Sequence, residues 1–167
     1  VGDPKSADTK VGTLISEKEA IRVEKSIAAA VGEGATLLTG GARTGAIVQP
    51  AIVCGVNPKS AFAQDELFGP AIAVSSTTGI TDAIAIANDS AYGLGAGVFT
   101  KNMDNSIQAA RELDAGSIHI NWTPLWRADL MPYGGLKSSG IGKEGVRSTV
   151  NEMTEEKTII LHGRSWQ

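Results

Sequence analysis

Cysteine, histidine and aromatic side chains are all scarce in this sequence of 167 residues. There is one cysteine, Cys54, with two histidines and 5% aromatic residues. A lone cysteine cannot form a disulfide within the chain and the start is not signal-like, so we expect a reducing, cytoplasmic location. The histidines, His119 and His162, are far apart and no cysteine pair accompanies them, so we expect no metal site.

An excess of positive charge and long apolar runs are also missing. Fifteen lysines and arginines against 18 aspartates and glutamates give a formal net charge of -3 and a pI near 5.4. We therefore expect neither a nucleic acid nor a membrane as a partner. The hydrophobic content of 42% suits one sizeable core, hence one domain. The chain opens with Val1 rather than methionine, so we expect it to belong to a longer polypeptide.

Strand and helix patterns alternate along the middle of the chain. We expect strands at 71–74, 96–100 and 117–121, with helices at 80–87 and 103–113 between them. This order is typical of parallel strands joined by right-handed helical crossovers on a common sheet, so the predicted fold class is α/β.

A further helix is predicted near the start of the chain. Ser16 and Glu19 have the spacing of a capping box, and Gly32 follows the last turn. The apolar residues that repeat on one face of this helix are Ile21, Ile27, Ala28 and Val31.

The turn Glu66-Leu67-Phe68-Gly69-Pro70 stands directly before the strand at 71–74. Pro70 fixes one backbone angle and Gly69 allows one that other residues resist, so Glu66 and Phe68 are expected to point from a defined corner. A carboxylate can bind sugar hydroxyls while a ring packs on a flat heterocycle, which suits a nucleoside. The alternative is an ordinary strand-entry turn with an exposed glutamate and a core phenylalanine.

A long irregular segment, residues 122–142, follows the strand that ends at Asn121. Ligands of parallel sheets gather at the carboxyl ends of strands, which makes this segment a candidate site. Trp122, Trp126 and Tyr133 could line an apolar tunnel, and glycines at 134–140 would let the backbone pass close to a neighbour. Arg127 could bind a carboxylate or phosphate, or else face solvent or pair with Asp129.

Two motif-like features are read as structural. Cys54 lies in an apolar run with no nearby histidine, lysine or helix start to lower its pKa, so we expect a core residue rather than a nucleophile. Residues 140–145 have the glycine spacing of a dinucleotide fingerprint but follow about twenty irregular residues instead of a strand, so we treat the match as coincidence.

Many fragments in order then carry a family resemblance: Val1-Gly2-Asp3-Pro4, Val11-Gly12, Ile15, Gly40-Gly41, residues 65–70, Ala87-Asn88, Tyr92-Gly93-Leu94, Val98-Phe99-Thr100, Ala115-Gly116, Ile120-Asn121 and residues 131–144. Across nearly its whole length the chain resembles the C-terminal part of the catalytic domain of NAD(P)-dependent aldehyde dehydrogenases. The loop at 125–129 is similar to enzymes that oxidise lactaldehyde, glyceraldehyde 3-phosphate without phosphorylation, or phosphonoacetaldehyde.

The resemblance implies a three-layer α/β/α fold with a mostly parallel sheet, truncated, in which residues 1–167 form the C-terminal portion of the catalytic domain. It implies that Glu66 binds the nicotinamide ribose of NAD or NADP and that Phe68 packs beside the nicotinamide. It places Asn121 and Trp122 at the active-site entry, and Trp126, Arg127 and Tyr133 in the segment around the aldehyde. A terminal strand at about 154–161 would serve a homo-oligomer, either a dimer or a tetramer.

In this family a cysteine thiolate attacks the aldehyde, hydride passes to NAD(P), and a glutamate-activated water hydrolyses the thioester. The resemblance implies that this cysteine, the glutamate and the Rossmann domain precede the stretch matched here, so no catalytic residue is assigned in the chain. We expect the chain to be inactive alone, as an expressed or proteolytic piece of a longer enzyme. The alternative is a natural truncated, non-catalytic binding or assembly module.

Overall fold

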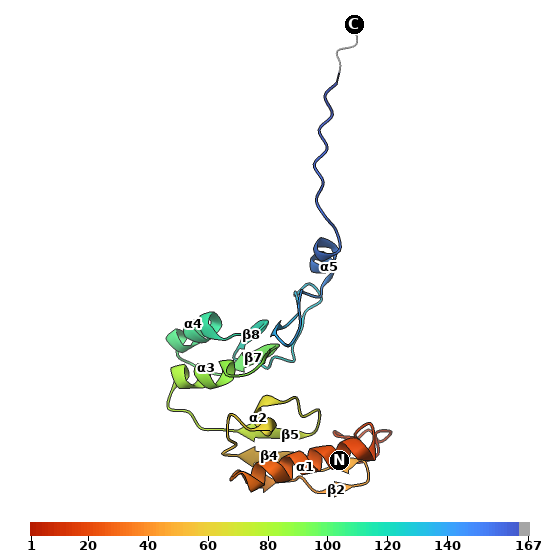
Figure 1. Cartoon of the computed structure of the whole chain (residues 1–167), viewed down its shortest axis with the longest axis vertical. Coiled ribbons are helices and arrows are strands. Elements are labelled where there is room, and N and C mark those ends of the chain that lie inside the picture. The colour runs from red at the N-terminus through yellow and green to blue at the C-terminus, as the bar shows by residue number, and fades with distance from the viewer. Residues whose placement is uncertain (164–167) are drawn as a thin grey trace. The chain divides into compact units, whose positions relative to one another are not determined.

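The computed structural model describes residues 1–163 and divides into two compact units, Val1–Ser90 and Ala91 onward (Figure 1). Each unit has its own sheets and its own helices. A single domain was expected from the length of the chain, but length does not reveal how the strands distribute among sheets.

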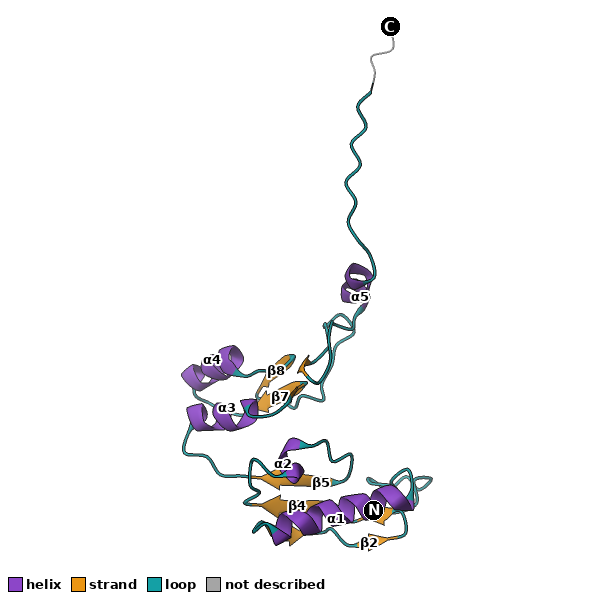
Figure 2. Ribbon diagram, viewed as in Figure 1, coloured by secondary structure: helices purple, strands orange, loops and turns teal. Residues whose placement is uncertain are grey.

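The first unit is built on a three-stranded sheet whose order is β1-β4-β5, with β1 antiparallel and β5 parallel to the central β4. Its elements are α1 (Glu17–Gly32), β1 (Thr36–Thr39), β2 (Arg43–Thr44), β3 (Ile47–Val48), β4 (Ala51–Cys54), α2 (Ala61–Gln64), β5 (Ala71–Val74) and α3 (Ile80–Asn88). The short strands β2 and β3 form a hairpin. The core lies between α1 and the sheet. Figure 2 shows the ribbon of α1 beside this sheet.

Helix α1 begins where the sequence predicted, because the Ser16 hydroxyl accepts a hydrogen bond from the Glu19 amide at 3.3 Å. The predicted buried face is only partly right. The buried residues of α1 are Ala20, Val23, Ile27 and Ala30, whereas Val31 and Ala28 are exposed. An alanine-rich helix has several apolar stripes, and tertiary packing selects the one whose small residues allow the closest approach.

The second unit contains β6 (Tyr92–Gly93), β7 (Gly95–Val98), α4 (Met103–Glu112), β8 (Ser117–Ile120), β9 (Leu136–Lys137) and α5 (Val146–Glu152). Strands β7 and β8 are parallel and α4 is the crossover between them, as predicted. The Asn102 side chain caps α4 by accepting from the amides of Asp104 and Asn105. Strands β6 and β9 form an antiparallel pair.

The mixed α/β class is confirmed, but the prediction of one common sheet for the strands at 71–74, 96–100 and 117–121 is wrong. The first of these, β5, pairs with β4, while β7 and β8 form a separate two-stranded sheet. Periodicity identifies a strand from its own residues, whereas the choice of hydrogen-bonding neighbour depends on residues distant in the sequence.

Residues 154–163 belong to no helix or strand and are exposed (Figure 2). The predicted terminal strand at 154–161 is therefore not formed within residues 1–163. An extended segment becomes a strand only when a neighbour supplies a ladder, and no strand of residues 1–163 pairs with it. Its role in an oligomer stays a prediction.

The turn at 66–70 packs directly on α1. A Cβ atom added at Gly69 would lie 2.6 Å from a methyl group of Val23, a fully buried valine. Sequence reasoning gave Gly69 a special backbone angle, but the left-handed residue is its neighbour Phe68, with φ 48°. Glycine is required at position 69 because the helix is so close.

We therefore expect Gly69→Ala to lower the free energy of unfolding by about 1–3 kcal/mol, the usual range for forcing an extra group into a packed core beside a stiff β-branched side chain. Urea unfolding measures this loss. Gly32→Ala is the matched control, since a Cβ at Gly32 meets no atom within 4 Å and helix propensity improves. Equal effects of the two substitutions would contradict the close-contact explanation.

Candidate functional site

The turn at 66–70 presents Glu66 and Phe68 outward from the edge of the first unit. Both side chains are exposed, and Phe68 keeps 77% of its surface accessible. The alternative of a core phenylalanine is therefore wrong. The sheet holds the backbone beside these residues, because the Ala51 amide of β4 donates to the Pro70 carbonyl at 2.8 Å. Within the turn, the Ala71 amide donates to the Gly69 carbonyl at 2.8 Å.

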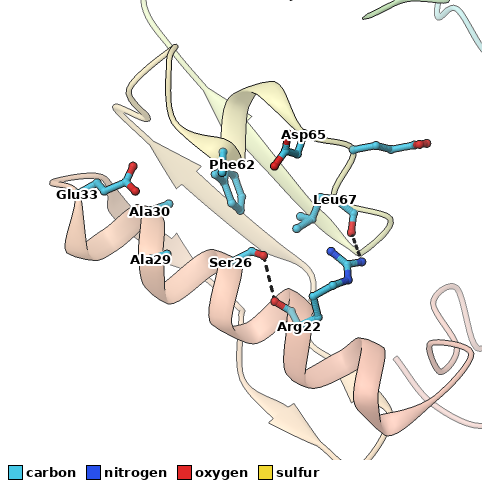
Figure 3. Close-up of a pocket in the computed structure, with 10 residues that line it drawn as sticks. Arg22, Ser26, Ala29, Ala30, Glu33, Phe62, Asp65 and Leu67 are labelled. Carbon is cyan, nitrogen blue, oxygen red and sulfur yellow. Dashed lines mark hydrogen bonds between the residues drawn. The ribbon is translucent and has the colours of Figure 1, made fainter. Parts of the chain in front are cut away.

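Arg22 of α1 holds the same turn from the other side. Its Nη2 donates to the Leu67 carbonyl at 2.7 Å (Figure 3). Its Nε donates to Glu19 at 2.7 Å. Leu67 itself packs against the core. The carbonyl between Glu66 and Phe68 thus accepts a charge-assisted hydrogen bond, which is stronger than a neutral one.

A cavity of about 260 Å³ lies between α1 and the segment 61–67. Figure 3 shows Phe62 and Leu67 facing α1 across it. Arg22, Asp65 and Glu66 bring charged groups to its lining, beside the alanines of the helix. The cavity therefore combines an apolar wall with polar groups, although at about 260 Å³ it is smaller than most small-molecule sites.

In the second unit, Asn121 follows the end of β8 with a left-handed backbone, φ 56°. Asparagine tolerates this conformation better than most residues. Its amide donates to the Val98 carbonyl at 2.6 Å, and its side-chain oxygen accepts from the Thr100 amide at 2.7 Å. Asn121 therefore joins the carboxyl ends of β7 and β8, the edge where a ligand was expected.

Arg127, Tyr133 and Glu144 come together in the irregular segment. The Arg127 guanidinium carbon lies 3.8 Å from the centre of the Tyr133 ring, and its Nη1 lies 3.9 Å from a Glu144 oxygen. Tyr133 and Glu144 also exchange backbone hydrogen bonds in an isolated β-bridge. Arg127 is thus stacked on an aromatic ring, and the expected alternative of a pair with Asp129 is not what the structure has.

The two tryptophans of the segment are more than half exposed, 58% for Trp122 and 51% for Trp126. The Trp126 ring meets His119 edge-on, with centroids 6.3 Å apart. The structure thus brings Tyr133 to Arg127 and Trp126 to His119, and does not gather the three predicted rings into one group. A tunnel lined by all three stays a prediction.

The glycine-rich stretch 134–140 allows the close backbone passage that was predicted. A Cβ atom at Gly116 would overlap the Gly134 carbonyl oxygen, at 1.6 Å. The Gly134 carbonyl accepts from the Lys143 ammonium group at 3.0 Å, and the Ser139 hydroxyl accepts from the Gly93 amide at 2.9 Å. Residues 140–145 connect this loop to α5 rather than a strand to a helix, so the structure gives no βαβ context for a dinucleotide fingerprint.

Sequence reasoning missed Arg22 and Glu144. Glu19 and Arg22 have the ordinary i,i+3 spacing of a surface ion pair on a helix, which gives no sign that Arg22 reaches a loop 45 residues away. Glu144 lies 17 positions after Arg127, in a stretch without periodicity. Neither contact has a local sequence signal.

Two further observations concern residues 1–163. Their helices lack the combination of length and apolarity that spanning a membrane requires. Their histidine, cysteine and acidic side chains form no cluster of three or more that could hold a metal ion.

Comparison with known proteins decides the family. The model of the aldehyde dehydrogenase family matches residues 1–159. The chain belongs to this family. A lactaldehyde dehydrogenase of Methanococcus maripaludis is 41% identical to it over 162 residues, which cover 97% of this chain and 35% of the relative. A 3-sulfolactaldehyde dehydrogenase of Priestia megaterium is 44% identical, covering 97% of this chain and 34% of the relative.

Solved aldehyde dehydrogenases share the fold. The glyceraldehyde-3-phosphate dehydrogenase GapN of Methanocaldococcus jannaschii, in complex with NADP, superposes with a TM-score of 0.89 at 40% identity, over 96% of this chain and 35% of that one. An NAD-dependent aldehyde dehydrogenase of Sinorhizobium meliloti gives a TM-score of 0.90 at 34% identity, over 100% of this chain and 34% of that one. The chain thus spans about a third of the length of these aldehyde dehydrogenases.

Cys54 is the one cysteine of the chain and lies half-buried in β4, between Thr36 of β1 and Val74 of β5. We expect Cys54→Ser to change the free energy of unfolding by no more than about 1 kcal/mol, since the substitution is nearly isosteric and the site is not fully buried. Chemical denaturation measures this. A much larger loss, or the loss of a thiol-dependent activity, would contradict a structural role for Cys54.

Proposed function

We propose that this chain is the C-terminal part of the catalytic domain of an NAD(P)-dependent aldehyde dehydrogenase that oxidises a small aldehyde to a carboxylic acid. The observation that carries the proposal is the turn at 66–70, which holds Glu66 and Phe68 exposed on a rigid base. Relatives at about 40% identity are named for lactaldehyde, 3-sulfolactaldehyde and sulfoacetaldehyde, all small aldehydes.

Glu66 and Phe68 fit one end of NAD or NADP. A carboxylate accepts hydrogen bonds from the two hydroxyls of a ribose, and an exposed ring offers a flat apolar surface to the nicotinamide. The left-handed backbone of Phe68 costs roughly 1–3 kcal/mol, the range for such conformations, and persists because the surrounding contacts determine it. Bound nicotinamide would supply the hydride acceptor, while Glu66 and Phe68 would orient it.

For the aldehyde, we propose the segment that begins at Asn121 and Trp122. Trp126 and Tyr133 offer apolar surface for the body of a small aldehyde, and Arg127 offers a positive charge. The stacking of Arg127 on Tyr133 supports this role because it presents the guanidinium in a fixed plane. A fixed guanidinium can bind a carboxylate, sulfonate or phosphate through two parallel hydrogen bonds.

The reaction needs a nucleophile, and we propose that it comes from outside these residues. A cysteine thiolate would form a thiohemiacetal with the aldehyde, and water would hydrolyse the thioester left after hydride transfer. Cys54 lies in the central strand of a sheet, which supports a structural role for it. We also propose a cytoplasmic location and a homo-oligomer, a dimer or tetramer, in which the exposed apolar residues Ile159, Ile160 and Leu161 find a partner strand.

The experiment that tests the function compares two proteins with NAD and with NADP. We expect the 167-residue chain to oxidise no aldehyde, because the steps that lower the barrier require a thiolate and a base. A longer protein, in which this chain is preceded by the nucleophile segment and the cofactor-binding domain of the family, is expected to oxidise small aldehydes. Turnover by the 167-residue chain that a thiol reagent abolishes would contradict the proposal.

The second candidate function is a non-catalytic binding or assembly module. The exposed apolar side chains Met103 and Ile107 on α4 favour it, since such a face suits contact with another protein. Genomic sequence decides between the two. An open reading frame that continues upstream into a cysteine-containing segment supports the enzyme, and an initiator methionine directly before Val1 supports the module.

Arg127→Leu tests the anion-binding role within the longer enzyme. We expect kcat/KM for an aldehyde with a carboxylate, sulfonate or phosphate to fall. The loss should correspond to about 1.5–3 kcal/mol of transition-state stabilisation, the range for hydrogen bonds to charged groups. An uncharged aldehyde of similar size should be oxidised almost as before. Steady-state kinetics with the two aldehydes measures the difference.

Arg147→Leu is the matched control, because it removes the same charge from an exposed position on α5. It should affect both aldehydes little. Equal losses for charged and uncharged aldehydes in Arg127→Leu, or no loss for either, would show that Arg127 has a structural role only.

A further inference from the structure

The turn at 66–70 depends on a contact from outside its own sequence. Phe68 occupies a backbone conformation that non-glycine residues rarely adopt, so the turn does not hold this shape by local preference. At its far end the Pro70 carbonyl accepts from the Ala51 amide of β4, and the Gly69 carbonyl accepts locally from the Ala71 amide. At its near end the Leu67 carbonyl receives the Arg22 guanidinium at 2.7 Å.

Arg22 is itself held in place. Its Nε donates to Glu19 at 2.7 Å, and the Glu19 amide donates to the capping hydroxyl of Ser16. The fork of the guanidinium thereby joins the first turn of α1 to the Leu67 carbonyl. Val23, the next residue, contacts Gly69 so closely that no Cβ atom fits. Two adjacent residues of α1 therefore meet both ends of the Leu67-Phe68-Gly69 backbone.

We propose that Arg22 is a positioning residue, which holds the Leu67 carbonyl and so fixes the directions of Glu66 and Phe68 on either side of it. This inference rests on the proposed role of Glu66 and Phe68 at the nicotinamide end of the cofactor. Arg22 acts through the backbone, since its Nη2 donates to the Leu67 carbonyl while its Nε donates to Glu19. Its loss frees the turn before any cofactor binds.

A lysine at position 22 would restore only part of the contact. An ammonium group is a point charge on a flexible stem, so it can reach either the Leu67 carbonyl or Glu19 but lacks the planar fork that joins both. Arg22→Lys is therefore expected to lie between the wild type and Arg22→Leu in every measurement. This order separates a hydrogen-bonding role from simple filling of space by the long side chain.

Amide hydrogen exchange in the 167-residue chain, without cofactor, is the direct test. The amides of Ala71 and Ala51 donate to the Gly69 and Pro70 carbonyls, so their exchange reports opening of the turn. We expect Arg22→Leu to accelerate exchange at Ala71 by about 10- to 100-fold, as for the loss of a hydrogen bond to a charged group. The Gly55 amide, which donates to the Val74 carbonyl at 3.1 Å at the other end of the β4–β5 pair, should change less.

Arg43→Leu is the matched control for this measurement. Arg43 of β2 also binds α1, through Glu24 at 2.8 Å and Glu17 at 3.0 Å, and the hydrogen bond to Glu24 raises the pKa of Arg43 above its ordinary value. It does not touch the turn at 66–70. We expect Arg43→Leu to accelerate exchange at Ala71 no more than at Gly55. Equal acceleration at Ala71 by the two leucine variants would overturn the proposal.

Cofactor affinity in the longer enzyme completes the test, with NAD and NADP titrated against protein fluorescence. We expect Arg22→Leu to raise Kd about tenfold, with Arg22→Lys intermediate. If Arg22→Leu weakens binding without accelerating exchange, Arg22 contacts the cofactor itself and the positioning role is overturned. If neither quantity changes, it is overturned as well.

Glu66→Gln distinguishes this inference from the function on which it rests. It should raise Kd for the cofactor and leave exchange at Ala71 unchanged. If Glu66→Gln leaves Kd unchanged while Arg22→Leu still accelerates exchange, the cofactor role of the turn is wrong and the contact from Arg22 to the turn stands. If Glu66→Gln weakens cofactor binding while Arg22→Leu neither accelerates exchange at Ala71 nor raises Kd, the inference alone is wrong.

Discussion

The packing of Val23 against Gly69 joins the core of the first unit to its candidate site. Val23 is fully buried in the layer between α1 and the sheet, and its methyl groups also meet the backbone of the turn at 66–70. A β-branched side chain in a close-packed core has little freedom, so Val23 restricts the movement of the turn that packs against it. The Arg22 hydrogen bond to Leu67 then fixes the carbonyl next to this contact. The same contacts of α1 therefore stabilise the core and orient Glu66 and Phe68.

The second unit reaches a fixed geometry by a different route. Its irregular segment has little core of its own, and backbone contacts close it: Gly116 against Gly134, Lys143 on the Gly134 carbonyl, and the bridge between Tyr133 and Glu144. These contacts hold Tyr133 where Arg127 stacks on its ring. A loop built in this way can present a charged group in a defined plane without burying it.

Several apolar side chains are exposed in this chain, which spans about a third of the length of its relatives. Met103 and Ile107 are four residues apart on one face of α4, and both are exposed. Helices with such a face normally pack against protein. Ile159 and Ile160, in the segment after α5, are exposed apolar residues as well.

The sequence by itself determined the elements and the family. Capping residues and apolar spacing located α1, α3 and α4, the strands β5, β7 and β8 followed from short apolar runs, and ordered motifs from Val1 to Glu144 identified an aldehyde dehydrogenase. These signals are local, so each can be read from a short window. They also gave Glu66 and Phe68 as the residues of a ligand-facing turn, which remains a proposal.

Only the tertiary structure decided which face of α1 is buried, that β5 and β7 lie in different sheets, and that Phe68 rather than Gly69 has the left-handed backbone. It also supplied Arg22 and Glu144, whose partners lie 45 and 17 residues away. The physical reason is common to all of these. Each depends on a contact between segments distant in sequence, and such contacts are set by how the whole chain packs rather than by the preference of any one segment.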